Sequence, residues 1–137
     1  MVRLRLRRRG RTHDPFYDIV AADARTKRDG KFIERLGYYN PMTQPSTISV
    51  NHERAIYWLD VGAQMSQTVR NIFHYDGVLL RRALQKQGRP AEEIERLVAE
   101  HRERVLARYW RNKEKRAERK RRKATAEAQS QSEQPTE

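Results

Sequence analysis

Residues 2–23 read VRLRLRRRGRTHDPFYDIVAAD, and this stretch decides the fold. Apolar side chains at even positions alternate with arginines at odd positions as far as Arg7, which is the two-residue period of a strand with one face on a core. Phe16 to Ala22 is rich in aromatic and β-branched residues and predicts a second strand, antiparallel to the first. Between them, residues 8–13 continue the positive charge into a loop in which Gly10 allows a sharp turn. The sequence therefore predicts two paired strands with a row of arginines on the outer face.

The following residues predict two more strands and a basic loop. Residues 23–31 lack apolar periodicity and contain the turn signal Asp29-Gly30, so they are expected to form a loop. Residues 32–39 predict a third strand, which Pro41 ends, and residues 46–50 predict a short fourth strand.

Two helices are expected after the strands. Asn51 can cap a helix that ends near Gly62, and Ser66 can cap a second one that Gly77 closes. Residues 78–87 can add another helical turn or two. The expected fold class is therefore α+β, with a small, mainly antiparallel four-stranded sheet packed by two short helices and followed by a C-terminal helical extension.

Beyond residue 84 the composition changes. Pro90 and the glutamates after it suit the start of a long helix, whose apolar stripe ends near Tyr109. Most residues from 111 to 123 are charged, so a helix there is solvated or lies on phosphate. We divide the chain into a domain at 1–84, a basic helical extension at 85–123 and a disordered polar tail at 124–137. Either residues 91–110 dock on a protein surface and residues 111–123 reach nucleic acid, or the whole appendage is solvated.

Composition narrows the class of function. The 137 residues carry 30 Lys and Arg against 18 Asp and Glu, a net charge of +12, and no cysteine. Most of the cations are arginines, which pair with phosphate through two hydrogen bonds, so a nucleic acid is the expected partner. The length excludes a large multi-domain enzyme, and the lack of cysteine excludes thiol catalysis and disulfides. Without a long apolar run, neither a membrane span nor a secretory signal is expected, and the mature chain is expected to begin near Met1.

Several short motifs occur in order over about the first 80 residues: Pro15-Phe16-Tyr17 with Ile19-Val20-Ala21, Arg28-Asp29-Gly30-Lys31-Phe32-Ile33-Glu34, Gly37-Tyr38-Tyr39-Asn40-Pro41, and Tyr57-Trp58-Leu59 with Val61-Gly62-Ala63-Gln64. In these motifs the chain resembles the bacterial small-subunit ribosomal protein S-sixteen family. Asp14 and Asp18 depart from the family pattern, because basic residues are common at those positions.

The resemblance implies a cytoplasmic protein of the bacterial ribosome. Such a protein binds the 5′ domain of small-subunit ribosomal RNA, supports its assembly for translation and has neighbouring small-subunit ribosomal proteins as partners. It implies RNA contact by the N-terminal basic strand and the following loops. With the cation clusters, this gives the expected RNA-binding residues: Arg3, Arg5, Arg7, Arg8, Arg9, Arg11, Thr12, His13, Arg25, Lys27, Arg28 and Lys31.

Two expectations concern particular side chains. Of Tyr38 and Tyr39, one is expected in the core, while the other either packs or stacks on a base. Changing Arg5, Arg7 and Arg9 together to glutamate is expected to abolish RNA binding and to leave the fold intact.

Catalysis has little support in the sequence. His13 and the aspartates at 14, 18, 23 and 29 could in principle hold Mg²⁺, so a metal-dependent nuclease is the alternative function. Their spacing is not that of paired metal ligands, and no phosphate-binding glycine loop occurs, so we expect no enzyme, cofactor, metal or small-molecule substrate. A general DNA-packaging protein is a third possibility.

Overall fold

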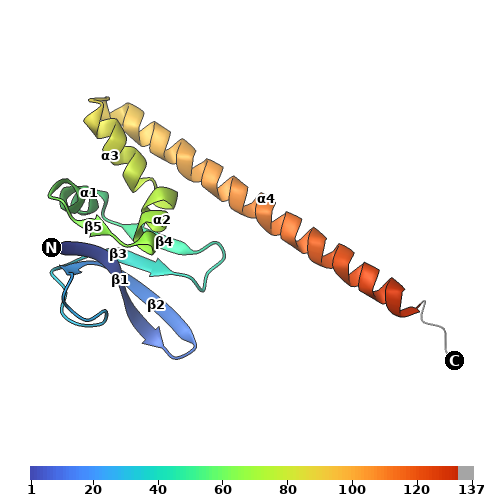
Figure 1. The fold of residues 1–137 in the computed structure, drawn as a ribbon. Coiled ribbons are helices and arrows are strands. Elements are labelled where there is room, and N and C mark those ends of the chain that lie inside the picture. The colour runs from blue at the N-terminus through green and yellow to red at the C-terminus, as the bar shows by residue number, and fades with distance from the viewer. Residues whose placement is uncertain (133–137) are drawn as a thin grey trace. The chain divides into compact units, whose positions relative to one another are not determined.

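The computed structural model describes residues 1–132 and divides the chain into two compact units, Met1–Arg102 and a second that begins at Glu103, which are described separately. The predicted α+β class is confirmed (Figure 1). Its elements are β1 (Val2–Arg11), β2 (Asp14–Asp23), β3 (Glu34–Asn40), β4 (Thr47–Val50), α1 (His52–Asp60), β5 (Gln64–Met65), α2 (Gln67–Asp76), α3 (Val78–Lys86) and α4 (Ala91–Ser132).

The sheet has five strands in the order β4-β3-β2-β1-β5, one more than the sequence predicts. The additional strand, β5, pairs parallel with β1 at Arg3 and Leu4. It has only two residues, which is too short for the alternation by which a strand is recognised in a sequence. Neighbouring pairs from β1 to β4 are antiparallel, as expected.

The first hairpin is longer than predicted. Strand β1 pairs with β2 along its whole length, from Val2 opposite Asp23 to Arg11 opposite Asp14. Residues 8–11, which we expected in a loop, therefore belong to the strand. The tight turn at Thr12 and His13 is the reason, because it brings β2 back at once as a hydrogen-bonding partner.

The main core lies between the sheet and the helices above it in Figure 1. Leu4 of β1 and Ile19 of β2 are fully buried on this face, together with Phe73 of α2. The predicted helix caps are confirmed. Asn51 accepts a hydrogen bond from the backbone of α1, Ser66 accepts one from the backbone of α2, and Gly77 ends α2 in the left-handed conformation.

Glu34 connects the sheet to α1. Its carboxylate accepts hydrogen bonds from Nε and Nη2 of Arg54 and from Nε1 of Trp58, each at 2.7 Å. The hydrogen bonds from Arg54 are the main cause that lowers the pKa of Glu34 below its ordinary value of 4.5.

This pKa shift predicts a pH-dependent stability. A carboxyl whose pKa is lower in the folded than in the unfolded chain stabilises the fold at any pH above its unfolded-state pKa. This stabilisation is lost as the pH falls through the folded-state pKa. Glu34→Gln is therefore expected to be less stable than the unaltered chain at pH 6, with the difference shrinking below about pH 4.5. Urea unfolding of both chains from pH 6 to pH 3 measures it. A difference in stability between the two chains that does not depend on pH would contradict this role of Glu34. Changes in stability with pH that both chains share come from other carboxyls.

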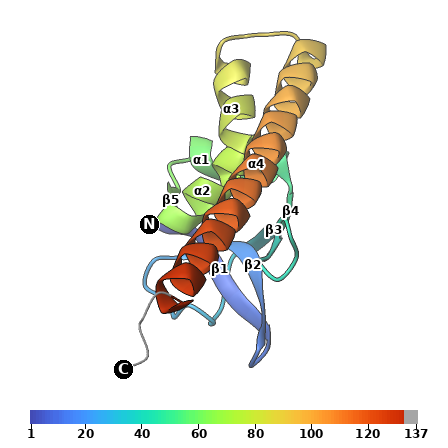
Figure 2. The same ribbon diagram turned by 90° about the vertical axis from the view of Figure 1, so that its right-hand side faces the viewer.

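The first turns of α4 pack on α3 within the first unit. Ile94 and Val98 are buried against Leu84, with Leu80 and Leu97 beside them, and Figures 1 and 2 both show these segments side by side. The alternative in which the whole appendage is solvated is therefore wrong for residues 91–102. The expected disorder of residues 124–137 is wrong as far as Ser132, because α4 continues to that residue through alanine, glutamate and glutamine, which favour helix. The rest of that tail, 133–137, lies outside the described residues.

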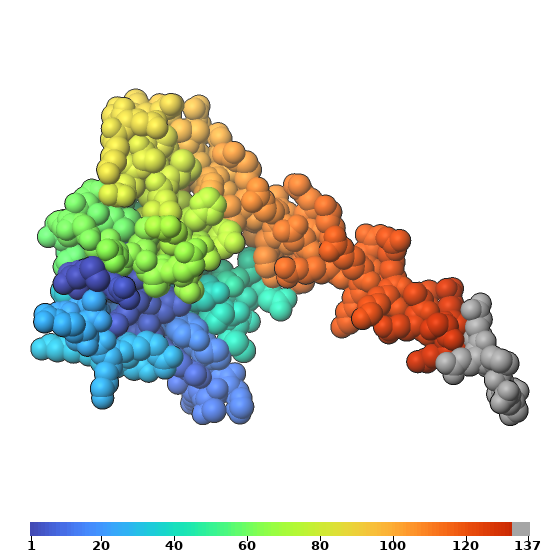
Figure 3. Space-filling view, in the orientation of Figure 1, coloured from blue at the N-terminus to red at the C-terminus, as the bar shows by residue number. Residues whose placement is uncertain are grey.

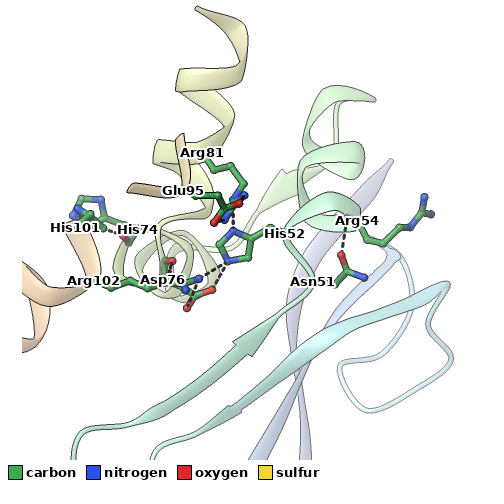
Figure 4. A network of polar contacts seen from close by, with 9 residues as sticks. All are labelled: Asn51, His52, Arg54, His74, Asp76, Arg81, Glu95, His101 and Arg102. Carbon is green, nitrogen blue, oxygen red and sulfur yellow. Dashed lines mark hydrogen bonds and ion pairs between the residues drawn. The ribbon is translucent and has the colours of Figure 1, made fainter. Parts of the chain in front are cut away.

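A polar network also holds the start of α4 (Figure 4). His52 at the start of α1 lies 2.7 Å from Asp76 of α2, and its Nδ1 accepts a hydrogen bond from Nε of Arg81. A guanidinium can only donate, so Nδ1 is the acceptor in this contact, while Nε2 lies beside both Asp76 and, at 3.1 Å, Nη2 of Arg102. Glu95 of α4 pairs with Arg81, and Arg102 of α4 donates to the backbone carbonyl of Asp76 at 2.9 Å. Both ends of this helical segment are thereby tied to α2 and α3.

Candidate nucleic-acid interface

The face of the sheet opposite the helices is partly covered by the segment between β2 and β3, residues 24–33 (Figure 1). Val20 and Ala22 alternate with the core residues of β2, so they point to this second face, yet each is only 1% exposed. The amide of Ile33 donates to the carbonyl of Ala21 at 2.8 Å and holds the end of the segment to the strand. This covering segment is the basic loop that the sequence predicts.

Arg5 anchors the loop to the strand. Its Nη2 donates to the backbone oxygen of Thr26 at 2.8 Å, to Oγ1 of the same residue at 2.7 Å and to the backbone oxygen of Lys27 at 3.0 Å. Arg5 lies opposite Val20 and is half-buried. Its guanidinium therefore organises the loop as well as adding charge.

Asp29 and Phe32 form a second attachment of the loop. The backbone amide of Arg8 donates to Oδ1 of Asp29 at 3.1 Å, and the guanidinium of Arg7 lies 5.2 Å from the centre of the Phe32 ring. The hydrogen bond from the Arg28 side chain is the largest cause of the lowered pKa of Asp29, and the Arg8 amide lowers it further. The loop thus occupies a free edge of β1, which would otherwise present unpaired backbone groups.

Arg9 has a structural role because it pairs with the buried carboxylate of Asp18. This carboxylate is 1% exposed and lies 3.2 Å from Nη1 of Arg9 and 2.9 Å from Nε of Arg35. A glutamate at position 9 would face a buried negative charge, and a glutamate at position 5 would release the loop. In contrast to the expectation from the sequence, we therefore expect the triple change at Arg5, Arg7 and Arg9 to disturb the fold. The contact of Asp18 with Arg9 and Arg35 could not be predicted from local motifs, because it depends on the register of three strands.

The remaining cations of the predicted site are exposed. Arg8 makes no ion pair within residues 1–132, and its Nη2 donates to the backbone oxygen of Thr12 at 3.3 Å. Four others make neither an ion pair nor a side-chain hydrogen bond within these residues: Arg3, Arg11, Lys27 and Lys31. Arg25 and Arg28 instead pair with the neighbouring carboxylates of Asp23 and Asp29. Thr12 and His13 are exposed at the hairpin turn. Figure 3 shows the hairpin and the adjacent loop at the lower edge of this unit, where no helix of the unit covers them.

Two aromatic rings extend the outer face. Phe16 stacks on Tyr38 with ring centres 5.3 Å apart, and both are half-exposed. Tyr39 packs against the main core, so one tyrosine of the pair is in the core, as expected. Sequence analysis did not identify Phe16 as a surface group. Its alternation with the core residues of β2 is the signal that could have placed it there.

The surface combines exposed cations that make no ion pair with two half-exposed rings, which suits a polyanion with accessible bases. Among residues 1–132, no three His, Cys, Asp or Glu side chains lie together as a metal site, and no helix is both long and apolar enough to cross a membrane.

Comparison with known proteins identifies the family. Residues 8–66 match the family model described as Ribosomal protein S16. A small ribosomal subunit protein bS16 from Prosthecochloris aestuarii is 44% identical over 128 residues, which is 93% of this chain and 95% of the relative. The chain belongs to the ribosomal protein S16 family. The predicted family is confirmed, as is the prediction that the chain is not an enzyme, since this family is a structural ribosomal component; the nuclease alternative is overturned.

Other members of the S16 family differ in length. The relative from Salinibacter ruber is 50% identical over 104 residues, covering 76% of this chain and 51% of the relative. The relative from Porphyromonas gingivalis is 56% identical over 82 residues, covering 60% of this chain and 43% of the relative. The chain thus spans about half the length of these two proteins.

Proposed function

We propose that this chain binds small-subunit ribosomal RNA in the cytoplasm, contacting the 5′ domain, and stabilises the folded RNA as the bacterial small subunit assembles beside neighbouring ribosomal proteins. The contact surface consists of the β1–β2 hairpin, the loop 24–31 and the half-exposed Phe16–Tyr38 pair. Family membership supports the ribosomal setting, and the chemistry of the surface supports RNA as the ligand.

One observation carries this proposal: Arg5 and Asp29 hold the basic loop against β1, so the loop cations and the strand cations form one surface. No carboxylate precedes Asp14 in the chain, and Asp18, Asp23 and Asp29 are paired with arginines. The unpaired cations therefore remain available for phosphate. Folded RNA suits this surface better than regular DNA because the cations lie on a strand, a turn and a loop rather than along one straight element.

Neutralising the four exposed cations that make no side-chain ion pair or hydrogen bond among the described residues is expected to abolish most RNA affinity. Changing Arg3, Arg11, Lys27 and Lys31 to glutamine removes up to four phosphate contacts, which lowers the salt dependence of binding and weakens it by roughly 100-fold near 0.1 M salt. The unfolding temperature should stay within about 2 °C, because none of the four supports the fold. Filter binding to a 5′-domain fragment of small-subunit ribosomal RNA, from 50 to 300 mM salt, measures this.

A second variant serves as the matched control. Arg70, Lys86 and Arg96 are exposed cations of the helices, and Arg89 is an exposed cation between α3 and α4. Their change to glutamine removes the same charge away from the proposed surface. This variant should bind RNA almost normally. Equal losses of RNA affinity in both variants would show that net charge alone drives binding, which would contradict the proposal. Full RNA affinity in the first variant would contradict it as well.

A further inference from the structure

The part of α4 that lies in the second unit carries its cations on one side. Of the ten Lys and Arg residues from 108 to 123, nine fall within about 200° of the helix circumference when each residue turns by about 100°. They form two adjacent rows. The first contains Arg108, Arg111, Lys115, Arg119 and Arg122, and the second contains Lys113, Arg116, Lys120 and Lys123. Glu114, Glu118 and the tenth cation, Arg121, lie on the other side.

The first row is unneutralised. Its five residues are exposed and make no ion pair with a carboxylate of the described residues. They occur at intervals of three and four residues, so the row extends over about 21 Å of helix. In the second row, Lys123 lies 3.7 Å from Glu127, and the ammonium of Lys113 lies 4.9 Å from the centre of the Trp110 ring.

The composition of this segment favours nucleic acid over protein as its partner. Between Arg111 and Lys123 the only apolar side chain is that of Ala117, and every residue there is exposed. A protein interface needs an apolar centre, which this segment cannot provide, whereas nucleic-acid interfaces are polar and strongly positive. Two cation rows on one straight helix can face the two phosphate backbones that border a groove of a duplex.

We propose that residues 108–123 form a second RNA contact, in which the two cation rows lie on the phosphate backbones of a double-helical RNA segment. The choice of RNA rests on the proposed function of the first unit, but the contact surface is separate from it. The helix binds duplex geometry and charge and reads no base sequence.

The test compares two arginines that are two positions apart, in the full chain. Arg119→Gln removes a cation from the first row, and Arg121→Gln removes the same charge from the other side. For a mixed-sequence RNA duplex of 20 base pairs, R119Q is expected to reduce the slope of log affinity against log salt by about 0.9, whereas R121Q leaves the slope unchanged. Changing Arg111, Lys115, Arg119 and Arg122 together to glutamine should reduce it by about 3 to 4 and lower affinity at 0.1 M salt at least tenfold.

The outcomes separate this proposal from that of the first unit. Circular dichroism should show the same helix content in all three variants, because glutamine is a good helix former. Equal effects of R119Q and R121Q, an unchanged slope in the fourfold variant, or equally tight binding of poly-glutamate would each overturn the helix contact. If ribosomal RNA binding nevertheless depends on the β1 surface, the function proposed above stands.

Discussion

Replacing Gly37 with alanine is expected to lower the free energy of unfolding by about 3 kcal/mol and the unfolding temperature by more than about 10 °C. A Cβ at this position would lie 1.9 Å from the backbone oxygen of Ser49 and 2.8 Å from the Cα of Val50. Both atoms belong to β4, which pairs with β3 at this position. The steric clash can therefore be relieved only if the two strands move apart. Thermal and urea unfolding measure the loss.

Gly62→Ala is the control for Gly37→Ala. Gly62 has a φ of 95°, where a side chain is strained, but an added Cβ would meet no atom within 4 Å. Its change to alanine is expected to cost only about 1 kcal/mol. A Gly37→Ala protein as stable as the Gly62→Ala protein would show that close strand approach does not limit the sheet.

Replacing Arg5 with methionine is expected to release the basic loop and reduce protection of the Ile33 amide from hydrogen exchange by roughly 100-fold. Methionine retains an apolar side chain over Val20 but loses all three hydrogen bonds to Thr26 and Lys27. Such bonds to a charged donor stabilise by about 3 kcal/mol in total. The change also removes the Nε of Arg5, a buried donor with no partner among the described residues, which offsets part of the loss.

Arg3→Met provides the matched comparison for Arg5→Met. Arg3 lies two residues earlier on the same face of β1, opposite Ala22, and is exposed. Its change should leave protection at Ile33 within about twofold, because it holds no part of the loop. If both variants lost protection equally, the loop would be held by general electrostatic attraction rather than by the Arg5 hydrogen bonds. RNA binding should fall in both, since each loses a cation.

Gly37 and Arg5 support the same surface from two different strands. Gly37 keeps β3 and β4 close, and β3 carries Arg35 and Tyr38 to the outer face. Arg5 keeps the loop on β1. The proposed interface therefore depends on groups that need not touch RNA, and losing either would weaken binding indirectly.

Much of the fold could be predicted from local pattern. Alternation of apolar residues with arginines gave β1, and side chains able to cap a helix gave the starts of α1 and α2 at Asn51 and Ser66. These signals are local, since they depend on residues within a few positions of one another. The two residues of β5 gave no such signal, because their pairing with β1 comes from tertiary packing.

The candidate site was predicted as a set of cations but not as an arrangement. The sequence identified the arginines of β1 and the basic loop, yet it treated them as equivalent. The structure separates Arg5 and Arg9, which support the loop and Asp18, from Arg3 and Arg11, which make no ion pair among the described residues.

By itself, the amino-acid sequence determined the α+β class, the positions of most strands and helices, the strongly basic character and the family resemblance, because each depends on composition or on short-range spacing. Only the tertiary structure decided which cations are available and where the covering loop lies. Those properties depend on strand register and on contacts between residues some 20 positions apart, such as Arg5 with Thr26. Burial and pairing of a charge are set by neighbours in space, and local pattern does not contain them.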